Sequence, residues 1–179
     1  TGSLKLPSSL TDIGIAAFLN CKYFTSLELS NALSVIPGSA FRGCEGLSGS
    51  LVIPDGVKEI GEQAFSGCTG FDGTLTLSSK LGKIGQYAFN GCTGFTGSLK
   101  LPSSLTEIGI GAFMNCKYFT SLELPNTLSV IPGSAFKGCT GLSGSLVIPN
   151  SVTEIGNQAF QNCTGFNGTL TLSNKLETI

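Results

Sequence analysis

The sequence predicts a solenoid: a single elongated, mainly β domain of stacked repeats whose strands pair from one repeat to the next. An Ala-Phe pair, followed three residues later by a cysteine, recurs seven times, and successive copies are 23 or 24 residues apart. A period of this length is typical of solenoids, in which each repeat contacts only its neighbours. Each repeat also contains a Ser/Thr-Leu-x-Leu/Ile segment whose alternation indicates a strand with one buried face. The Ala-Phe pairs begin at Ala17, Ala40, Ala64, Ala88, Ala112, Ala135 and Ala159.

One repeat shows the expected order of elements. Residues 50–53 form the strand, which ends at Pro54 because proline has no N–H to extend a ladder. Val57 and Ile60 make a second apolar pair, which indicates a short extended segment. The Gly-x-x-Ala-Phe-x-x-Cys stretch at 61–68 is too short for a full helix, so we expect a single helical or 3₁₀ turn there.

Four repeats make a longer unit of 95 residues, here called a block. Residues 1–84 and 96–179 are identical at 67 of 84 positions, which indicates duplication of the block. One repeat in each block is 23 residues long, because residues 24–27 lack the turn glycine present in residues 71–75. We therefore expect a single domain, 1–179, made of copies 1–95 and 96–179, the second partial, and taken from a longer protein.

Composition excludes several classes of function. The net charge is −1 with 12% charged residues, so no basic patch for nucleic acid is expected. No apolar run approaches the roughly 20 residues of a membrane span. Histidine is absent, which removes the usual general base near neutral pH and the commonest metal ligand. We expect no enzyme, no cofactor and no metal site. Neither end carries a polar cap, so each should present an open repeat face.

The string Leu-x-x-Ile-Gly-x-x-Ala-Phe-x-x-Cys-x-x-Phe/Leu resembles the BspA-type (treponemal-type) leucine-rich repeat. It occurs at 10–24, 57–71, 81–95, 105–119 and 152–166, with Val as the first residue in two of these, and with proline replacing the glycine at 33–47 and 128–142. The resemblance implies a right-handed leucine-rich-repeat solenoid with a parallel sheet on its concave side. It also implies a secreted or surface-anchored protein that acts as an adhesin, without catalytic residues.

The seven cysteines favour a buried row of thiols. Their spacing of 23 or 24 residues does not fit the close pairs of a zinc site. Parallel side chains in a ladder would keep successive Cβ atoms about 5 Å apart, beyond the ~3.8 Å typical of a disulfide. Disulfides between neighbouring repeats remain the alternative.

The exposed middle position of each strand gives the candidate partner-binding site on the concave face. We call these residues the strand-face row; they are Lys5, Glu28, Val52, Thr76, Lys100, Glu123, Val147 and Thr171. The alternative is that the Lys-Glu pairs only keep the sheet soluble, contributing about 0.2–1 kcal/mol each. Asn167, in an Asn-Gly-Thr sequon on a turn, is a possible glycosylation site.

These observations predict a non-enzymatic extracellular or cell-surface module for adhesion or recognition. Its expected partner is a protein or glycan, with no nucleic acid and no direct insertion into a membrane. The alternative is a structural repeat of an extracellular fibre or coat that assembles end to end with copies of itself.

Overall fold

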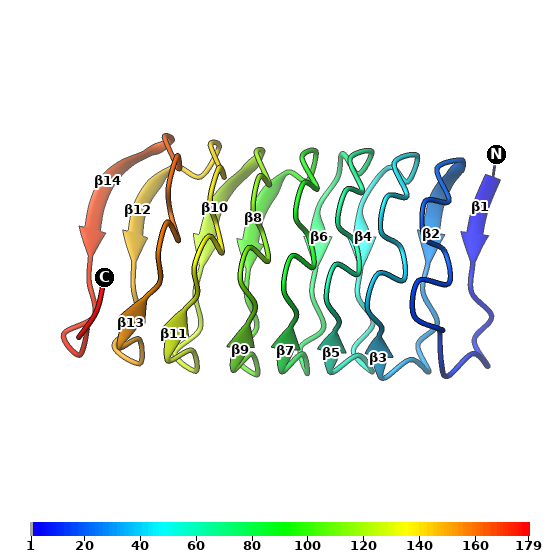
Figure 1. Ribbon diagram of the computed structural model, residues 1–179, viewed down its shortest axis with the longest axis horizontal. Helices are drawn as coiled ribbons and strands as arrows, with labels where there is room; N and C mark the ends of the chain where they lie inside the picture. The colour runs from blue at the N-terminus through cyan, green and yellow to red at the C-terminus, as the bar shows by residue number, and fades with distance from the viewer. Residues whose placement is uncertain (1) are drawn as a thin grey trace.

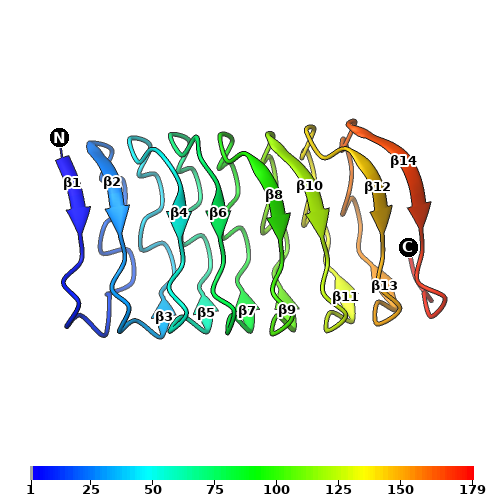
Figure 2. The same ribbon diagram turned by 180° about the vertical axis from the view of Figure 1, so that it is seen from behind.

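The computed structural model, which describes residues 2–179, is a parallel β-solenoid of about seven turns (Figure 1). The leucine-rich-repeat architecture expected from the sequence is confirmed. Strands form two rows along the solenoid; the long strands run its whole length, and the second row begins at β3, in the second repeat (Figures 1 and 2). The first row contains the eight expected strands: β1 (Gly2–Lys5), β2 (Phe24–Glu28), β4 (Leu51–Val52), β6 (Leu75–Thr76), β8 (Gly97–Lys100), β10 (Phe119–Glu123), β12 (Gly144–Val147) and β14 (Phe166–Thr171).

A second row arises from the second apolar pair of each repeat. Its strands are two residues long: β3 (Val35–Ile36), β5 (Glu59–Ile60), β7 (Lys83–Ile84), β9 (Glu107–Ile108), β11 (Val130–Ile131) and β13 (Glu154–Ile155). Strands β3, β5, β7 and β9 form one parallel sheet and β11 pairs with β13. The isoleucines of this row point into the core, since Ile36, Ile60 and Ile84 are completely buried.

The long strands pair two by two. Parallel pairs join β1 to β2, β4 to β6, β8 to β10 and β12 to β14. Leucines face the core in register, as Leu51 does opposite Leu75 and Leu4 opposite Leu27. Between β6 and β8 the described chain has only one isolated bridge, from Thr74 to Thr96. The predicted sheet is therefore present, but it is interrupted along the solenoid axis.

The expectation of a helical or 3₁₀ turn in each repeat was wrong. Within residues 2–179 there is no helix; the segment is a run of separate turns. In residues 61–68, Ala64 donates its N–H to Gly61 of the same repeat, whereas Phe65 donates to Ala88 of the next repeat at 2.8 Å. A positive φ at Gln63 (55°) and Gly67 (74°) reverses the backbone after each turn. Because helices of L-residues require negative φ, the turn cannot propagate.

Phenylalanine rings stack along the core, one from each repeat. Successive rings of Phe18, Phe41, Phe65, Phe89, Phe113, Phe136 and Phe160 lie nearly parallel with centroids 5.3–5.7 Å apart. This spacing lies in the favourable range for aromatic pairs. The adjoining alanine has no room for a larger side chain, since Ala64, Ala88 and Ala112 are completely buried. The Ala-Phe motif thus marks a completely buried contact between interior repeats.

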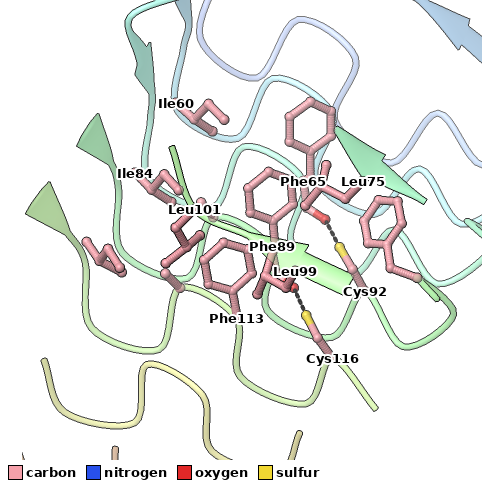
Figure 3. Packing of buried hydrophobic residues seen from close by; sticks show 14 of the residues in the cluster. Ile60, Phe65, Leu75, Ile84, Phe89, Cys92, Leu99, Leu101, Phe113 and Cys116 are labelled. Carbon is pink, nitrogen blue, oxygen red and sulfur yellow. Dashed lines mark hydrogen bonds between the residues drawn. The ribbon is translucent and has the colours of Figure 1, made fainter. Parts of the chain in front are cut away.

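The cysteines form a row of free thiols, of which five are buried and two, Cys21 and Cys163, are half-buried. From the second repeat onward, each Sγ donates a hydrogen bond to the phenylalanine carbonyl of the preceding repeat. Figure 3 shows two of these bonds, from Cys92 to Phe65 at 3.0 Å and from Cys116 to Phe89 at 3.2 Å. Burial raises the pKa of Cys92 to about 12 and that of Cys44 to about 11. The thiols therefore serve as small apolar core residues with one satisfied donor.

We expect the free energy of unfolding to fall steadily as the pH rises above about 9, the ordinary value for these thiols. The unfolded chain then loses thiol protons that the folded chain keeps, so the folded state binds more protons and is destabilised. Each buried thiol should add a slope of about 1.4 kcal/mol per pH unit until its own folded pKa is reached. Urea titrations from pH 7 to 11 measure this slope. A double Cys68→Ala, Cys92→Ala variant should show a smaller slope; an unchanged slope would contradict the assignment.

A matched pair of glycine substitutions tests how closely the repeats approach. A Cβ on Gly94 would overlap the carbonyl oxygen of Phe71, whereas one on Gly82 would lie 3.7 Å from the Lys58 carbonyl. Gly94→Ala should lower the free energy of unfolding by about 1–3 kcal/mol. Gly82→Ala should leave it unchanged or raise it by about 0.4–1 kcal/mol. Denaturant midpoints measure both, and equal effects would disprove the steric argument.

Candidate functional site

The structure places all eight residues of the strand-face row on one face of the solenoid, each exposed to solvent. The face is that of the long strands, at the front of Figure 2. Backbone pairing sets the row in register: Lys5 lies opposite Glu28, and Val52 opposite Thr76. The second block repeats this arrangement, with Lys100 opposite Glu123 and Val147 opposite Thr171. The row therefore lies along one face of the solenoid, in register within each pair of strands.

Two ion pairs cross the strands of this face. Lys5 Nζ lies 3.0 Å from a Glu28 carboxylate oxygen, and Lys100 Nζ lies 3.1 Å from that of Glu123. All four side chains are more than half exposed. Such exposed pairs contribute little to stability, about 0.2–1 kcal/mol. Their charges remain accessible to a partner.

A hollow of about 640 Å³ opens in the middle of the face, between β6 and β8. It forms where the long strands are joined by a single bridge, at the junction of the two blocks. Thr76 and Lys100 of the strand-face row lie on its walls. The remaining lining combines hydroxyl groups with apolar side chains and consists of Thr74, Leu75, Leu77, Ser79, Ser98, Pro102 and Ser103. The sequence analysis did not single out this hollow.

One wall of the hollow is fixed by a carboxylate. Ser79 donates its backbone N–H and its hydroxyl to Asp55 Oδ1, at 2.9 and 3.0 Å. These two hydrogen bonds lower the pKa of Asp55 below its ordinary value, so the carboxylate stays charged. The loop after β6 is therefore held in place at the rim of the hollow.

Asn167 is exposed, and it has a structural role in the fold. Its Oδ1 accepts a hydrogen bond from the Gly144 N–H at 3.1 Å. Asp72 does the same for Gly49 in the first block, at 2.7 Å. The side chain therefore bridges two repeats, and its glycosylation remains a sequence-based prediction.

A charged network that the sequence analysis missed lies on the second row. Lys83 Nζ is 3.6 Å from Glu59 and 3.7 Å from Glu107, and the three residues occupy the same position of successive repeats. The signal in the sequence is their spacing of 24 residues. These side chains line a polar hollow of about 460 Å³ with Gly61, Gly85 and neighbouring residues.

At the C-terminal side of the described chain, core positions of the last repeat are open. Leu170 is 59% exposed, whereas its counterpart Leu75 in the first block is 6% exposed. The apolar hollow there has a volume of about 600 Å³ and is lined by Leu146, Ile155, Phe160 and other core side chains. In interior repeats the same surface is covered by the next repeat.

The described residues contain neither a metal-ligand cluster nor a candidate membrane helix. No three cysteine, aspartate or glutamate side chains within residues 2–179 converge as metal ligands. That range contains no helix that is long and apolar enough to cross a bilayer.

Comparison with protein families identifies the repeat. A model of the BspA type leucine rich repeat region matches in six copies over residues 1–72 and 36–167. No curated protein is significantly similar to the chain.

Solved structures share the architecture. A leucine-rich repeat protein from Bacteroides ovatus ATCC 8483 is 30% identical with a TM-score of 0.85, over 98% of this chain and 46% of that one. The chain thus spans about half the length of that protein. A leucine-rich repeat protein of T. pallidum is 28% identical with a TM-score of 0.81, over 92% of this chain and 78% of that one. A leucine-rich cell surface protein of Faecalibacterium prausnitzii is 24% identical with a TM-score of 0.55, over 95% of this chain and 59% of that one, which shows the fold alone.

Proposed function

Because this chain belongs to the family of BspA-type leucine-rich repeat proteins, we propose that it is a non-enzymatic recognition module of the cell surface or extracellular space. It binds a protein or glycan partner through the long-strand face. The observation that carries this proposal is the hollow between β6 and β8, which combines hydroxyl groups, apolar side chains and a lysine in the middle of this face. Solenoids use extended faces of this kind for binding.

The chemistry of the face suits recognition better than catalysis. Hydroxyl groups of Thr74, Thr76 and Ser98 surround apolar side chains in the hollow, and Lys100 supplies a charge at its edge. Pockets that bind ligands combine an apolar lining with a few placed polar groups in this way. The chain lacks histidine, so a general base of the usual kind is missing.

Substitutions at the hollow test this function. Lys100→Glu and Thr76→Arg should each weaken saturable binding to an immobilised extracellular-matrix protein or glycan about tenfold or more, or ~1.4 kcal/mol. The Lys100 side chain is exposed, so the free energy of unfolding should change by less than about 1 kcal/mol. Surface plasmon resonance over a panel of such ligands measures the affinities.

The matched control is Lys175→Glu, which makes the same charge change at an exposed residue outside the hollow. It should bind as the wild type does. Binding that survives both substitutions in the hollow would show that this face is not the site.

A second candidate function is end-to-end assembly into an extracellular fibre or coat, and the duplication of a four-repeat block in which each repeat stacks on the next favours it. Light scattering over a concentration series tests this: a mass that grows with concentration, and that Leu170→Lys abolishes, would support assembly. A constant monomer mass would contradict it.

A further inference from the structure

Two exposed tyrosines occupy a position that is glycine in every other repeat. The position lies two residues after each cysteine, at the rim where the long strands begin (top of Figure 2). Tyr23 and Tyr118 stand there in the two 23-residue repeats, and their exposed fractions are 77% and 61%. The glycines of the other repeats are Gly46, Gly70, Gly94, Gly141 and Gly165.

Close stacking explains why the other repeats need glycine. A Cβ on Gly70 would overlap the carbonyl oxygen of Glu45, and one on Gly94 would overlap that of Phe71. At these positions the missing side chain would point into the preceding repeat. The shortened repeats lack one residue shortly after this position, and there the tyrosine side chain reaches solvent. These are thus the repeats in which the rim can display a large side chain.

A lysine directly precedes each tyrosine. Lys22 lies 2.9 Å from Glu45 of the next repeat, so part of its charge is neutralised. In the second block threonine replaces that glutamate, at Thr140, and Lys117 makes no ion pair within residues 2–179. The second Lys-Tyr pair therefore carries an uncompensated positive charge.

The two Lys-Tyr pairs lie four repeats apart on the same rim. With strands about 4.8 Å apart, the tyrosines are separated by roughly 19 Å. Between them the position carries only Gly46, Gly70 and Gly94, so no side chain rises there to block a ligand that spans both pairs. Thr69 and Thr93 precede two of these glycines and supply hydroxyl groups along the path, while the carboxylate of Glu45, which precedes Gly46, is paired with Lys22.

We propose that this rim, separate from the strand-face row, binds a linear anionic polysaccharide that contacts Tyr23 and Tyr118 together. Tyrosine offers a large, rigid and amphipathic surface at low entropic cost, suited to stacking on the face of a sugar ring. The adjacent lysines attract carboxylate or sulfate groups of the polymer. Two Lys-Tyr anchors on one rim match a periodic linear ligand, because the second contact then forms at high effective concentration.

The test is titration of the protein with polygalacturonate, with neutral dextran as the comparison polymer, by isothermal calorimetry. We expect binding to polygalacturonate alone, weakening as salt rises because exposed charges are screened. A double Tyr23→Ser, Tyr118→Ser variant should lose about tenfold or more in affinity as the two-point attachment disappears. Digalacturonate is too short to reach both tyrosines. Its affinity for the wild type should therefore be no higher than the affinity of the double variant for polygalacturonate.

Matched variants distinguish binding at this rim from binding at the other charged surfaces of the solenoid. Lys117→Gln should weaken binding more than Lys58→Gln, an exposed lysine elsewhere with the same charge change. Lys100→Glu on the strand-face row should leave polygalacturonate binding intact, so this proposal and the proposed function can fail separately.

Melting temperatures of the tyrosine variants should equal that of the wild type, since both rings are exposed. Equal binding of dextran and polygalacturonate, or a double tyrosine variant that binds like the wild type, would overturn the proposal.

Discussion

Close approach of the backbone between successive repeats is the constraint on which the rest of this structure depends. Phe65 donates its N–H to Ala88 of the next repeat at 2.8 Å, and the equivalent bond recurs along the solenoid. At that spacing, about 4.8 Å, the core has room for an alanine, a stacked ring and a thiol in every layer. Large side chains at the alanine or at the close-contact glycines would separate the repeats. Few kinds of residue satisfy these positions, which is why the period is so easily recognised.

The same constraint decides where the protein can display chemistry. Side chains that point along the axis meet the neighbouring repeat, so variation is confined to positions that point outward. The strand-face row is one such set, and the network around Lys83 is another. Shortening a repeat by one residue opens a further position, where Tyr23 and Tyr118 replace glycine. A change in repeat length therefore alters the surface without altering the core.

Duplication of the block copies surface features at a fixed distance, while the junction between blocks creates something new. The exposed pairs Val52 and Val147, and Tyr23 and Tyr118, are related by 95 residues. The hollow between β6 and β8 instead lies at the junction of the copies, where Thr76 of the first block faces Lys100 of the second. The hollow at this junction therefore combines side chains of both copies in one place.

The sequence by itself determined the repeat length, the leucines that face inward and the outward row from Lys5 to Thr171. These follow from period and alternation, which are local properties of the chain. It did not determine that residues 61–68 form separate turns, because the positive φ of Gln63 is stabilised by bonds to the next repeat. Nor did it reveal the hollow or the partners of Asp55 and Lys83, which depend on how one repeat meets another. Only the tertiary structure decided these features, since hydrogen bonds and gaps between repeats belong to their packing and not to any single repeat.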